Sequence, residues 1–303
     1  MTRHVLEIDD LDAAEIARVL DLAADRACPP LLSGQTVGLY FEKPSLRTRH
    51  SCEAAVVQLG GHPVTFHADE VGGGREPMAD IARVLSGYHA AVGGRVFQHE
   101  VLQELAAASS IPVINLLSDS GHPCQALADL LTMRQEWGGL EDRTVAWIGD
   151  FTNVARSLAL GAARSGVRVR IASPADFGPS EADLERLVAA GMQAGPFVTD
   201  QPDEAVVGAD AVHTDVWASM GQEHEADQRR RAFAGFQVDD ALMARARAHA
   251  VFMHCLPAHR GDEVAASVVE GPQSRVFPQA HNRLHAFRGL LRLLLDDGAG
   301  AGA

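Results

Sequence analysis

Residues 36–49 of the chain read TVGLYFEKPSLRTR. The apolar and β-branched run from Thr36 to Phe41 is typical of a buried strand. A helix then follows, which we expect over 47–59. A strand that passes directly into a helix is the building unit of parallel α/β sheets.

The same alternation continues along the chain. We expect further helices at 10–26, with Asp10 as its cap, and at 76–88, 123–136, 153–165, 180–191 and 281–296. The other expected strands are 90–97, 112–116, 144–150, 167–172, 209–214 and 250–254. This pattern predicts an α/β protein with two doubly wound parallel-sheet domains joined by interdomain helices. We expect domains at 1–137 and 138–283, with a helix at 284–297 that packs back on the first.

Composition excludes several classes of function. The 303 residues contain 26 basic and 40 acidic side chains, a net charge of −14. Such a chain is a poor partner for nucleic acid or for an anionic membrane. No apolar run approaches the roughly 18–20 residues of a membrane span, and the start lacks a signal-peptide core. The four cysteines show no paired spacing, which favours a cytoplasmic protein with free thiols.

The segment from Ser45 to Arg49 is a candidate anion site. Exposed backbone N–H groups at a helix start favour an anion, and Ser45 and Thr48 add hydroxyl donors. Arg47 and Arg49 point in different directions, so one can hold the anion while the other braces the loop. The alternative is an ordinary capped helix with two solvated arginines.

Two other helix or strand ends carry reactive side chains. His122 and Gln125 lie three apart at a helix start, so both can reach one carbonyl group. Cys255 follows a buried strand, at the sheet edge where ligands bind in open α/β folds. The alternatives are a buried, hydrogen-bonded histidine and a cysteine that acts as a small hydrophobe. Adjacent His254 and Cys255 lack the spacing of a zinc site.

Two loops complete the set of candidates. Asp215 follows a strand, and its carboxylate could bind a ligand ammonium; an ordinary surface loop is the alternative, although Trp217 and Met220 would be unusual there. The turn at Gly149 invites a dinucleotide interpretation, but the G-x-G-x-x-G pattern is missing. We therefore expect no nicotinamide cofactor and no metal.

Together these segments resemble the ornithine carbamoyltransferase family. The resemblance extends from about 36 to 290. It rests on motifs that occur in the family's order: residues 41–49, His122-Pro123-Cys124-Gln125, residues 215–221, His254-Cys255-Leu256-Pro257-Ala258, and the weaker pair Asn282-Arg283. Such enzymes transfer the carbamoyl group of carbamoyl phosphate to the δ-amino group of L-ornithine, without a cofactor.

The resemblance implies a role for each motif residue. Carbamoyl phosphate would be bound by Ser45, Leu46 through its N–H, Arg47, Thr48, Arg95, His122, Gln125, Cys255 and Arg283. Ornithine would be bound by Asn153, Asp215, Ser219, Met220, Cys255 and Leu256. Arg95, His122, Asp215 and Cys255 would be catalytic. The family's active site borrows a neighbour's loop, so we expect a homotrimer or a multiple of trimers.

Some positions depart from the family pattern. Leu46 stands where the family usually has threonine, Phe151-Thr152 replaces Gly-Asn, and Gln279 and His281 replace acidic residues. Leu46 occurs in relatives that use acylated ornithines. A sibling transferase acting on N-acylated ornithine, putrescine or aspartate is therefore one alternative, and a ligand-binding relative without activity is another.

Overall fold

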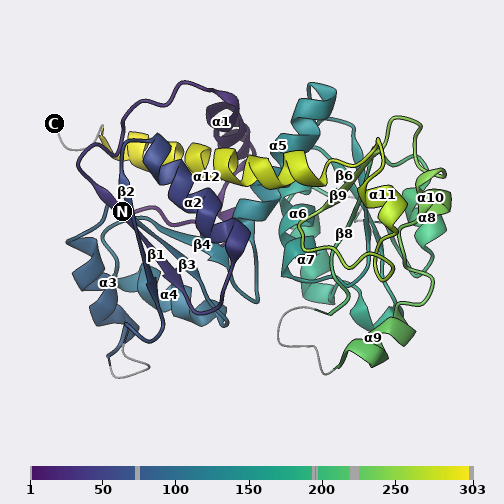
Figure 1. Ribbon diagram of the computed structural model, residues 1–303, viewed down its shortest axis with the longest axis horizontal. Helices are drawn as coiled ribbons and strands as arrows, with labels where there is room; N and C mark the ends of the chain where they lie inside the picture. The colour runs from purple at the N-terminus through teal and green to yellow at the C-terminus, as the bar shows by residue number, and fades with distance from the viewer. Residues whose placement is uncertain (1, 72–75, 193–194, 196, 219–224, 300–303) are drawn as a thin grey trace. The chain divides into compact units, whose positions relative to one another are not determined.

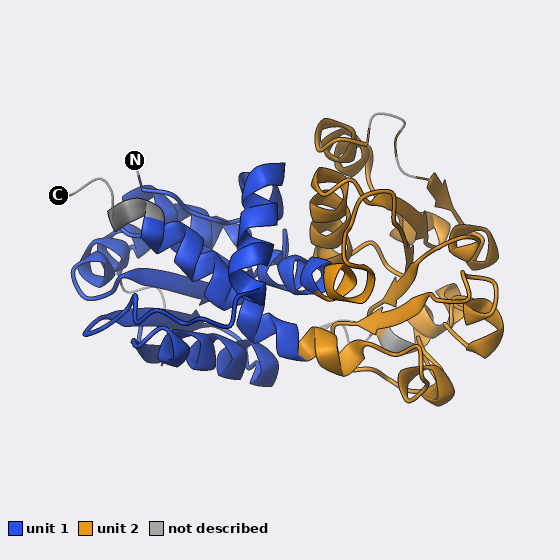
Figure 2. Ribbon diagram, turned by 90° about the horizontal axis from the view of Figure 1, so that it is seen from above, with its two compact units in different colours: residues 1–131, 281–303 blue, residues 132–280 orange. Residues whose placement is uncertain are grey.

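The computed structural model describes residues 2–71, 76–192, 195, 197–218 and 225–299. The chain divides into two compact units, which Figure 2 colours separately. Unit 1 comprises residues 1–131 and 281–303, and unit 2 comprises residues 132–280. Unit 1 is thus built from both ends of the chain. The division falls a few residues before each of the two predicted boundaries.

Unit 1 contains, among its described residues, a four-stranded sheet of order β2-β1-β3-β4 in which every pairing is parallel. Its strands are β1 Thr36–Phe41, β2 His62–His67, β3 Ala91–Arg95 and β4 Val113–Leu117. Strand order reverses between β1 and β3, so their carboxyl ends flank a topological switch point, where open α/β sheets bind ligands.

Helices cover both faces of this sheet (Figure 1). One face carries α1 Ala13–Ala24, α2 Leu46–Gln58 and most of α12 Val276–Ala299; the other carries α3 Met78–Ser86 and α4 His99–Ala108. The 3-10 turn η1 Ile8–Asp10 precedes α1. Helix α12 approaches α1 closely, because a Cβ on Gly289 would lie 2.6 Å from the Val19 carbonyl oxygen. Arg288 and Arg292 donate to the carbonyl oxygens of Ala23 and Leu22 in α1.

Unit 2 contains, within the described chain, a five-stranded sheet of order β7-β6-β5-β8-β9, again with parallel pairings. The strands are β5 Thr144–Ile148, β6 Arg168–Ala172, β7 Phe197–Thr199, β8 Ala211–Thr214 and β9 Val251–His254. Its helical segments are α6 Asn153–Arg164, η2 Ala175–Phe177, α7 Glu181–Ala189, α8 Pro202–Val206, α9 Ala226–Ala232, α10 Asp240–Met243 and α11 Ala266–Val269. Helix α5 Pro123–Trp137 begins in unit 1 and ends in unit 2. The switch point lies between β5 and β8.

The predicted fold class is confirmed, with corrections to individual elements. Asp10 does not cap α1. The cap is Asp12, which forms a reciprocal capping box with Glu15, whereas the Asp10 side chain accepts from the backbone N–H of Glu7 at the start of η1. The last helix begins at Val276, earlier than the predicted starts at 281 and 284, and Arg283 lies inside it. Strands β2 and β7, helix α4 and the short helices α8 to α11 were not predicted.

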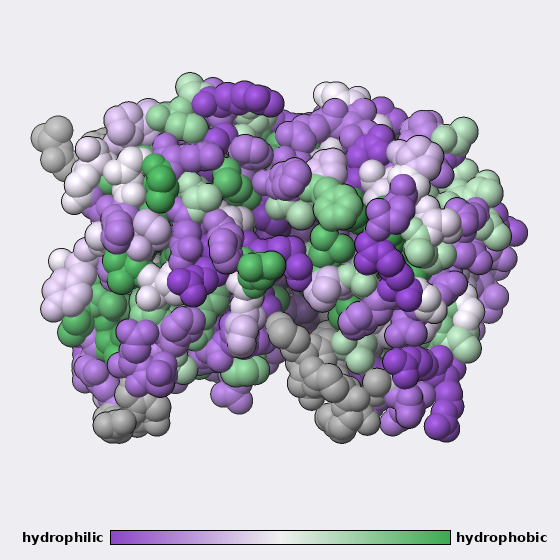
Figure 3. Space-filling view, in the orientation of Figure 1, coloured by the Kyte–Doolittle hydropathy of each residue, from purple (hydrophilic) through white to green (hydrophobic). Residues whose placement is uncertain are grey.

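The surface view shows a mostly hydrophilic face (Figure 3). Hydrophilic residues predominate on the face shown in Figure 3, and hydrophobic ones are scattered among them. Within the part of the chain that the structure describes, no helix is both long enough and apolar enough to cross a bilayer. All four cysteines are free thiols, as predicted.

Candidate functional site

The candidate anion residues of unit 1 lie at the carboxyl ends of adjacent strands. Ser45 to Thr48 follow β1, Arg95 is the last residue of β3, and His122 follows β4. Because parallel strands share one carboxyl edge, the sheet brings these segments together across its switch point. Arg283 joins them from α12.

Hydrogen bonds tie these side chains into one cluster. The Thr48 hydroxyl accepts from Arg283 Nη2 at 2.7 Å and from Arg95 Nη1 at 3.5 Å. Arg283 Nη1 donates to Gln125 Oε1 at 2.6 Å, and Gln125 Nε2 donates to Asp129 at 2.8 Å. All five side chains are buried. Two guanidinium groups against a single carboxylate leave this cluster with excess positive charge, which favours an anionic ligand.

His122 is buried beside these cations. Its pKa is held well below the usual value of 6.5, first by burial and then by the positive charges of Arg283, Arg95 and Lys43. Burial and Arg95 also lower the pKa of Lys43, whose ammonium lies 4.7 Å from the centre of the Phe97 ring. The imidazole is therefore neutral at physiological pH. A neutral histidine can donate one hydrogen bond to a carbonyl oxygen without adding charge.

The start of α2 is capped by a serine, and the residues that follow differ in exposure. Ser45 is its N-cap and accepts from the Thr48 N–H at 3.4 Å. The Leu46 side chain is 70% exposed, so a leucine here changes the surface and not the buried cluster. Arg47 is partly buried, whereas exposed Arg49 pairs with Glu53 at 2.8 Å. The two arginines thus differ in exposure and in partners, and the role of Arg47 in anion binding stays a prediction.

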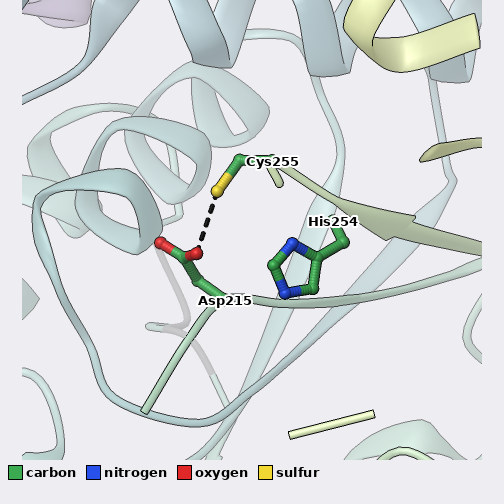
Figure 4. A group of neighbouring side chains, drawn as sticks. All are labelled: Asp215, His254 and Cys255. Atoms are coloured by element: carbon green, nitrogen blue, oxygen red, sulfur yellow. Dashed lines mark hydrogen bonds between the residues drawn. The ribbon is translucent and has the colours of Figure 1, made fainter. Parts of the chain in front are cut away.

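In unit 2, Asp215 and Cys255 form a direct contact. They follow the adjacent strands β8 and β9, whose last paired residues are Thr214 and His254. The Cys255 thiol donates to Asp215 Oδ1 at 2.9 Å (Figure 4). Asp215 is 8% exposed and also accepts from the Val216 N–H. A carboxylate and a thiol at one edge of the sheet can together bind and deprotonate an amine.

His254 lies next to this pair but does not make it a metal site. Potential ligand atoms of Asp215, His254 and Cys255 lie within 4.8 Å of one another. However, His254 Nδ1 accepts from the Leu256 N–H at 2.9 Å, and Nε2 faces Glu263 at 3.2 Å. Both ring nitrogens are engaged within the protein, so the imidazole offers no lone pair to a cation.

The structure describes two of the other residues predicted to bind ornithine, Asn153 and Leu256. Asn153 is the first residue of α6, directly after the β5 turn, and its Oδ1 accepts from the Val154 N–H. Leu256 directly follows Cys255 and has a left-handed backbone with φ 61°. Ser219 and Met220 lie outside the described residues. Trp217 is only 9% exposed and stacks on Phe233, so this part of the loop is not an ordinary surface loop.

Models of a single family cover nearly the whole chain. The "Aspartate/ornithine carbamoyltransferase, carbamoyl-P binding domain" matches residues 3–135, and the "Asp/Orn binding domain" of the same family matches residues 141–294. The chain belongs to the aspartate/ornithine carbamoyltransferase family. The resemblance stated from the motifs is confirmed.

Individual members of the carbamoyltransferase family are similar over their full length. An ornithine carbamoyltransferase of Acidothermus cellulolyticus is 51% identical, over 100% of this chain and 99% of its own. Among solved structures, ornithine carbamoyltransferase from Pyrococcus furiosus has a TM-score of 0.92 at 41% identity, covering 97% of both chains. The enzyme from Thermus thermophilus has a TM-score of 0.88 at 43% identity, covering 97% of this chain and 99% of its own.

Several residues that hydrogen-bond to the candidate site or to its loops were not predicted from the sequence. Asp129 accepts from Gln125 one helical turn away, a spacing of four that could have revealed it. Arg229 donates to Asp150 at 2.6 Å and to the Trp217 carbonyl oxygen at 2.9 Å. This pair links the loop after β8 to the turn after β5, but 79 residues separate its members, and no local pattern predicts it.

Proposed function

We propose that this protein is an ornithine carbamoyltransferase, which converts carbamoyl phosphate and L-ornithine to L-citrulline and phosphate. The observation that carries the proposal is the buried cluster of Thr48, Arg95, Gln125 and Arg283 beside neutral His122. Full-length relatives that bear this name support the choice of substrate.

The cluster in unit 1 suits carbamoyl phosphate. The phosphate would be held by Arg47, by the hydroxyls of Ser45 and Thr48, and by the N–H groups at the start of α2. The carbonyl oxygen gains negative charge in the tetrahedral transition state, and Arg95, Thr48 and His122 would stabilise that charge. Gln125 would orient the carbamoyl amide, and Arg283 completes the set of cations.

The pair in unit 2 suits the acceptor. Asp215 can bind an ammonium group of ornithine, and Cys255 with Leu256 would meet the δ-amine; Asn153, Ser219 and Met220 would bind the α-amino and α-carboxylate groups. The δ-amine must lose its proton before it attacks the carbonyl carbon. A new C–N bond then forms, the C–O bond to phosphate breaks, and phosphate leaves with that bonding pair.

The decisive experiment is a citrulline assay with a matched pair of variants. Arg47→Ala should lose most activity while remaining folded, because Arg47 would contact phosphate. Arg49→Ala is the control, since Arg49 is exposed and pairs with Glu53. A panel of N-acetylornithine, putrescine and aspartate tests the sibling activities. Failure to form citrulline from ornithine would show that the proposal is wrong.

The proposal extends to assembly and location. We expect a homotrimer or a multiple of trimers, in which a loop near residues 70–75 reaches a neighbouring subunit; residues 72–75 of this loop lie outside the described chain. Four free cysteines favour a reducing compartment such as the cytoplasm. A fully active monomer in light scattering would contradict the assembly.

A further inference from the structure

Three buried polar side chains lie directly behind Asp215 and Cys255. His213 stands two residues before Asp215, in β8, and His254 is the last residue of β9. Gln279 lies in the first turn of α12 and belongs to unit 2. Each of the three has 0% exposure. A polar side chain buried to this degree is costly unless its hydrogen bonds are satisfied.

The amide of Gln279 bridges the two strands. Its Oε1 accepts from the His254 backbone N–H at 2.9 Å, so its Nε2 must be the donor. That Nε2 lies 3.0 Å from His213 Nε2, which therefore accepts. His213 Nδ1 lies 3.1 Å from the Thr214 carbonyl oxygen, which can only accept. All these contacts agree on one arrangement, a neutral His213 with its proton on Nδ1.

A second set of contacts holds the loop after β9. His254 Nδ1 accepts from the Leu256 N–H, so the ring proton is on Nε2 and is donated to Glu263 Oε1. Glu263 is fully buried and also accepts from the His259 N–H at 2.5 Å. Leu256 has a positive φ, which leucine rarely adopts without support from its surroundings. The two sets share His254.

The position of this bridge matters because the sheet stops there. The pairing of β8 with β9 ends at Thr214 and His254, one residue before Asp215 and Cys255. No described ladder pair lies beyond that point, so the 2.9 Å contact of Cys255 with Asp215 depends on what fixes the two strand ends. Gln279 is bonded to both, through the His254 backbone on one side and the His213 ring on the other.

We propose that Gln279 is a positioning residue of the reaction: its side-chain amide locks the ends of β8 and β9 and so sets the spacing of the acceptor-binding pair Asp215 and Cys255. This inference rests on the proposed ornithine carbamoyltransferase activity. Gln279 itself would touch neither substrate, and its contribution is carried by His213 and His254.

Two variants at this position and one control test the proposal. Gln279→Met has a similar length and removes both amide bonds. Gln279→Asn keeps the amide but is one methylene shorter, so it cannot form hydrogen bonds with both strand ends. The control is Gln273→Met, because the Gln273 amide donates at 2.8 Å to the carbonyl oxygen of Ala250, which directly precedes β9 at the end opposite to His254. Steady-state citrulline assays give kcat and the KM of each substrate.

We expect Gln279→Met to raise the KM for ornithine about tenfold, the factor that corresponds to about 1.4 kcal/mol, which is within the range for one buried hydrogen bond. The KM for carbamoyl phosphate should stay at its wild-type value, and Gln273→Met should change neither KM. Gln279→Asn should also raise the KM for ornithine, and it decides the question if Gln279→Met does not fold.

A residue that only supports folding would give a different pattern. It would lower the fraction of active enzyme, so apparent kcat would fall while both KM values stayed unchanged. That result, or equal rises in the Gln273→Met control, would overturn the proposal. Absence of citrulline with the wild-type enzyme would instead refute the activity on which it rests, so the two failures are distinguishable.

Discussion

Thr48→Val tests the buried cation cluster with the smallest change of shape. Thr48 is 1% exposed, and valine fills nearly the same volume without the hydroxyl. The substitution removes the acceptor for Arg283 Nη2 at 2.7 Å and for Arg95 Nη1 at 3.5 Å. The short contact is a hydrogen bond to a charged group, worth about 1.5–3 kcal/mol, whereas the long one lies at the limit and adds little.

We therefore expect the free energy of unfolding to fall by about 1.5–3 kcal/mol, measured by urea titration with linear extrapolation. The KM for carbamoyl phosphate should rise at least about tenfold, because a ligand hydroxyl is lost and two guanidinium groups lose their common acceptor. The KM for ornithine should hardly change.

Thr65→Val is the matched control for this substitution. Thr65 also lies in unit 1, and its hydroxyl donates to the Glu53 carboxylate at 2.7 Å. The control should lower stability without changing the KM for carbamoyl phosphate. If Thr48→Val and Thr65→Val behaved alike in that KM, the assignment of Thr48 to the anion site would be wrong.

Four further outcomes are expected. Cys255→Ala removes the donor to Asp215 and should raise the KM for ornithine about tenfold; an unchanged ornithine saturation curve would count against it. Leu46→Thr should leave both KM values unchanged, because the Leu46 side chain is 70% exposed; a shift in acceptor preference on the substrate panel would contradict this. The pKa of His122 is lowered in the folded protein, so the unfolded chain binds more protons below about pH 6.5. The free energy of unfolding should therefore fall as the pH drops below about 6.5, by up to about 1.4 kcal/mol per pH unit. His122→Gln should flatten that slope in urea titrations. Arg288→Met removes the hydrogen bonds to the Gln58 side chain and to the carbonyl oxygens of Ala23 and Asp25. It should lower the free energy of unfolding by about 2–4 kcal/mol and leave both KM values unchanged.

Elements with a strong local pattern were predictable from the sequence. Strand β1 and helix α2 were placed within a residue or so, because an apolar run and an N-cap serine mark them. Strand β2 was missed: it is an edge strand that contains Pro63 and is only partly buried, so it lacks a continuous apolar run. Strand β7 is also an edge strand, with only three residues. Their assignment depends on pairing with β1 and β6, which no short window of sequence contains.

The same distinction applies to the candidate site. Motif residues at strand ends could be named as candidates because the carboxyl edge of a parallel sheet is a general place for ligands. The bonds that organise them join distant positions: Arg283 reaches Thr48 across 235 residues, and Gln279 reaches His213 across 66. A single sequence shows which side chains can form hydrogen bonds, but their partners are chosen by the folded chain.

The double origin of unit 1 has a consequence for its biosynthesis. Residues 132–280, which form unit 2, leave the ribosome before the part of α12 that belongs to unit 1, residues 281–299. Until then, α1 lacks the buried Arg288 and Arg292 that bind carbonyl oxygens at its end, and the surface against which Gly289 packs is uncovered. Unit 1 of a nascent chain is therefore incomplete while unit 2 can already fold. The domain that is translated first is the last to be finished.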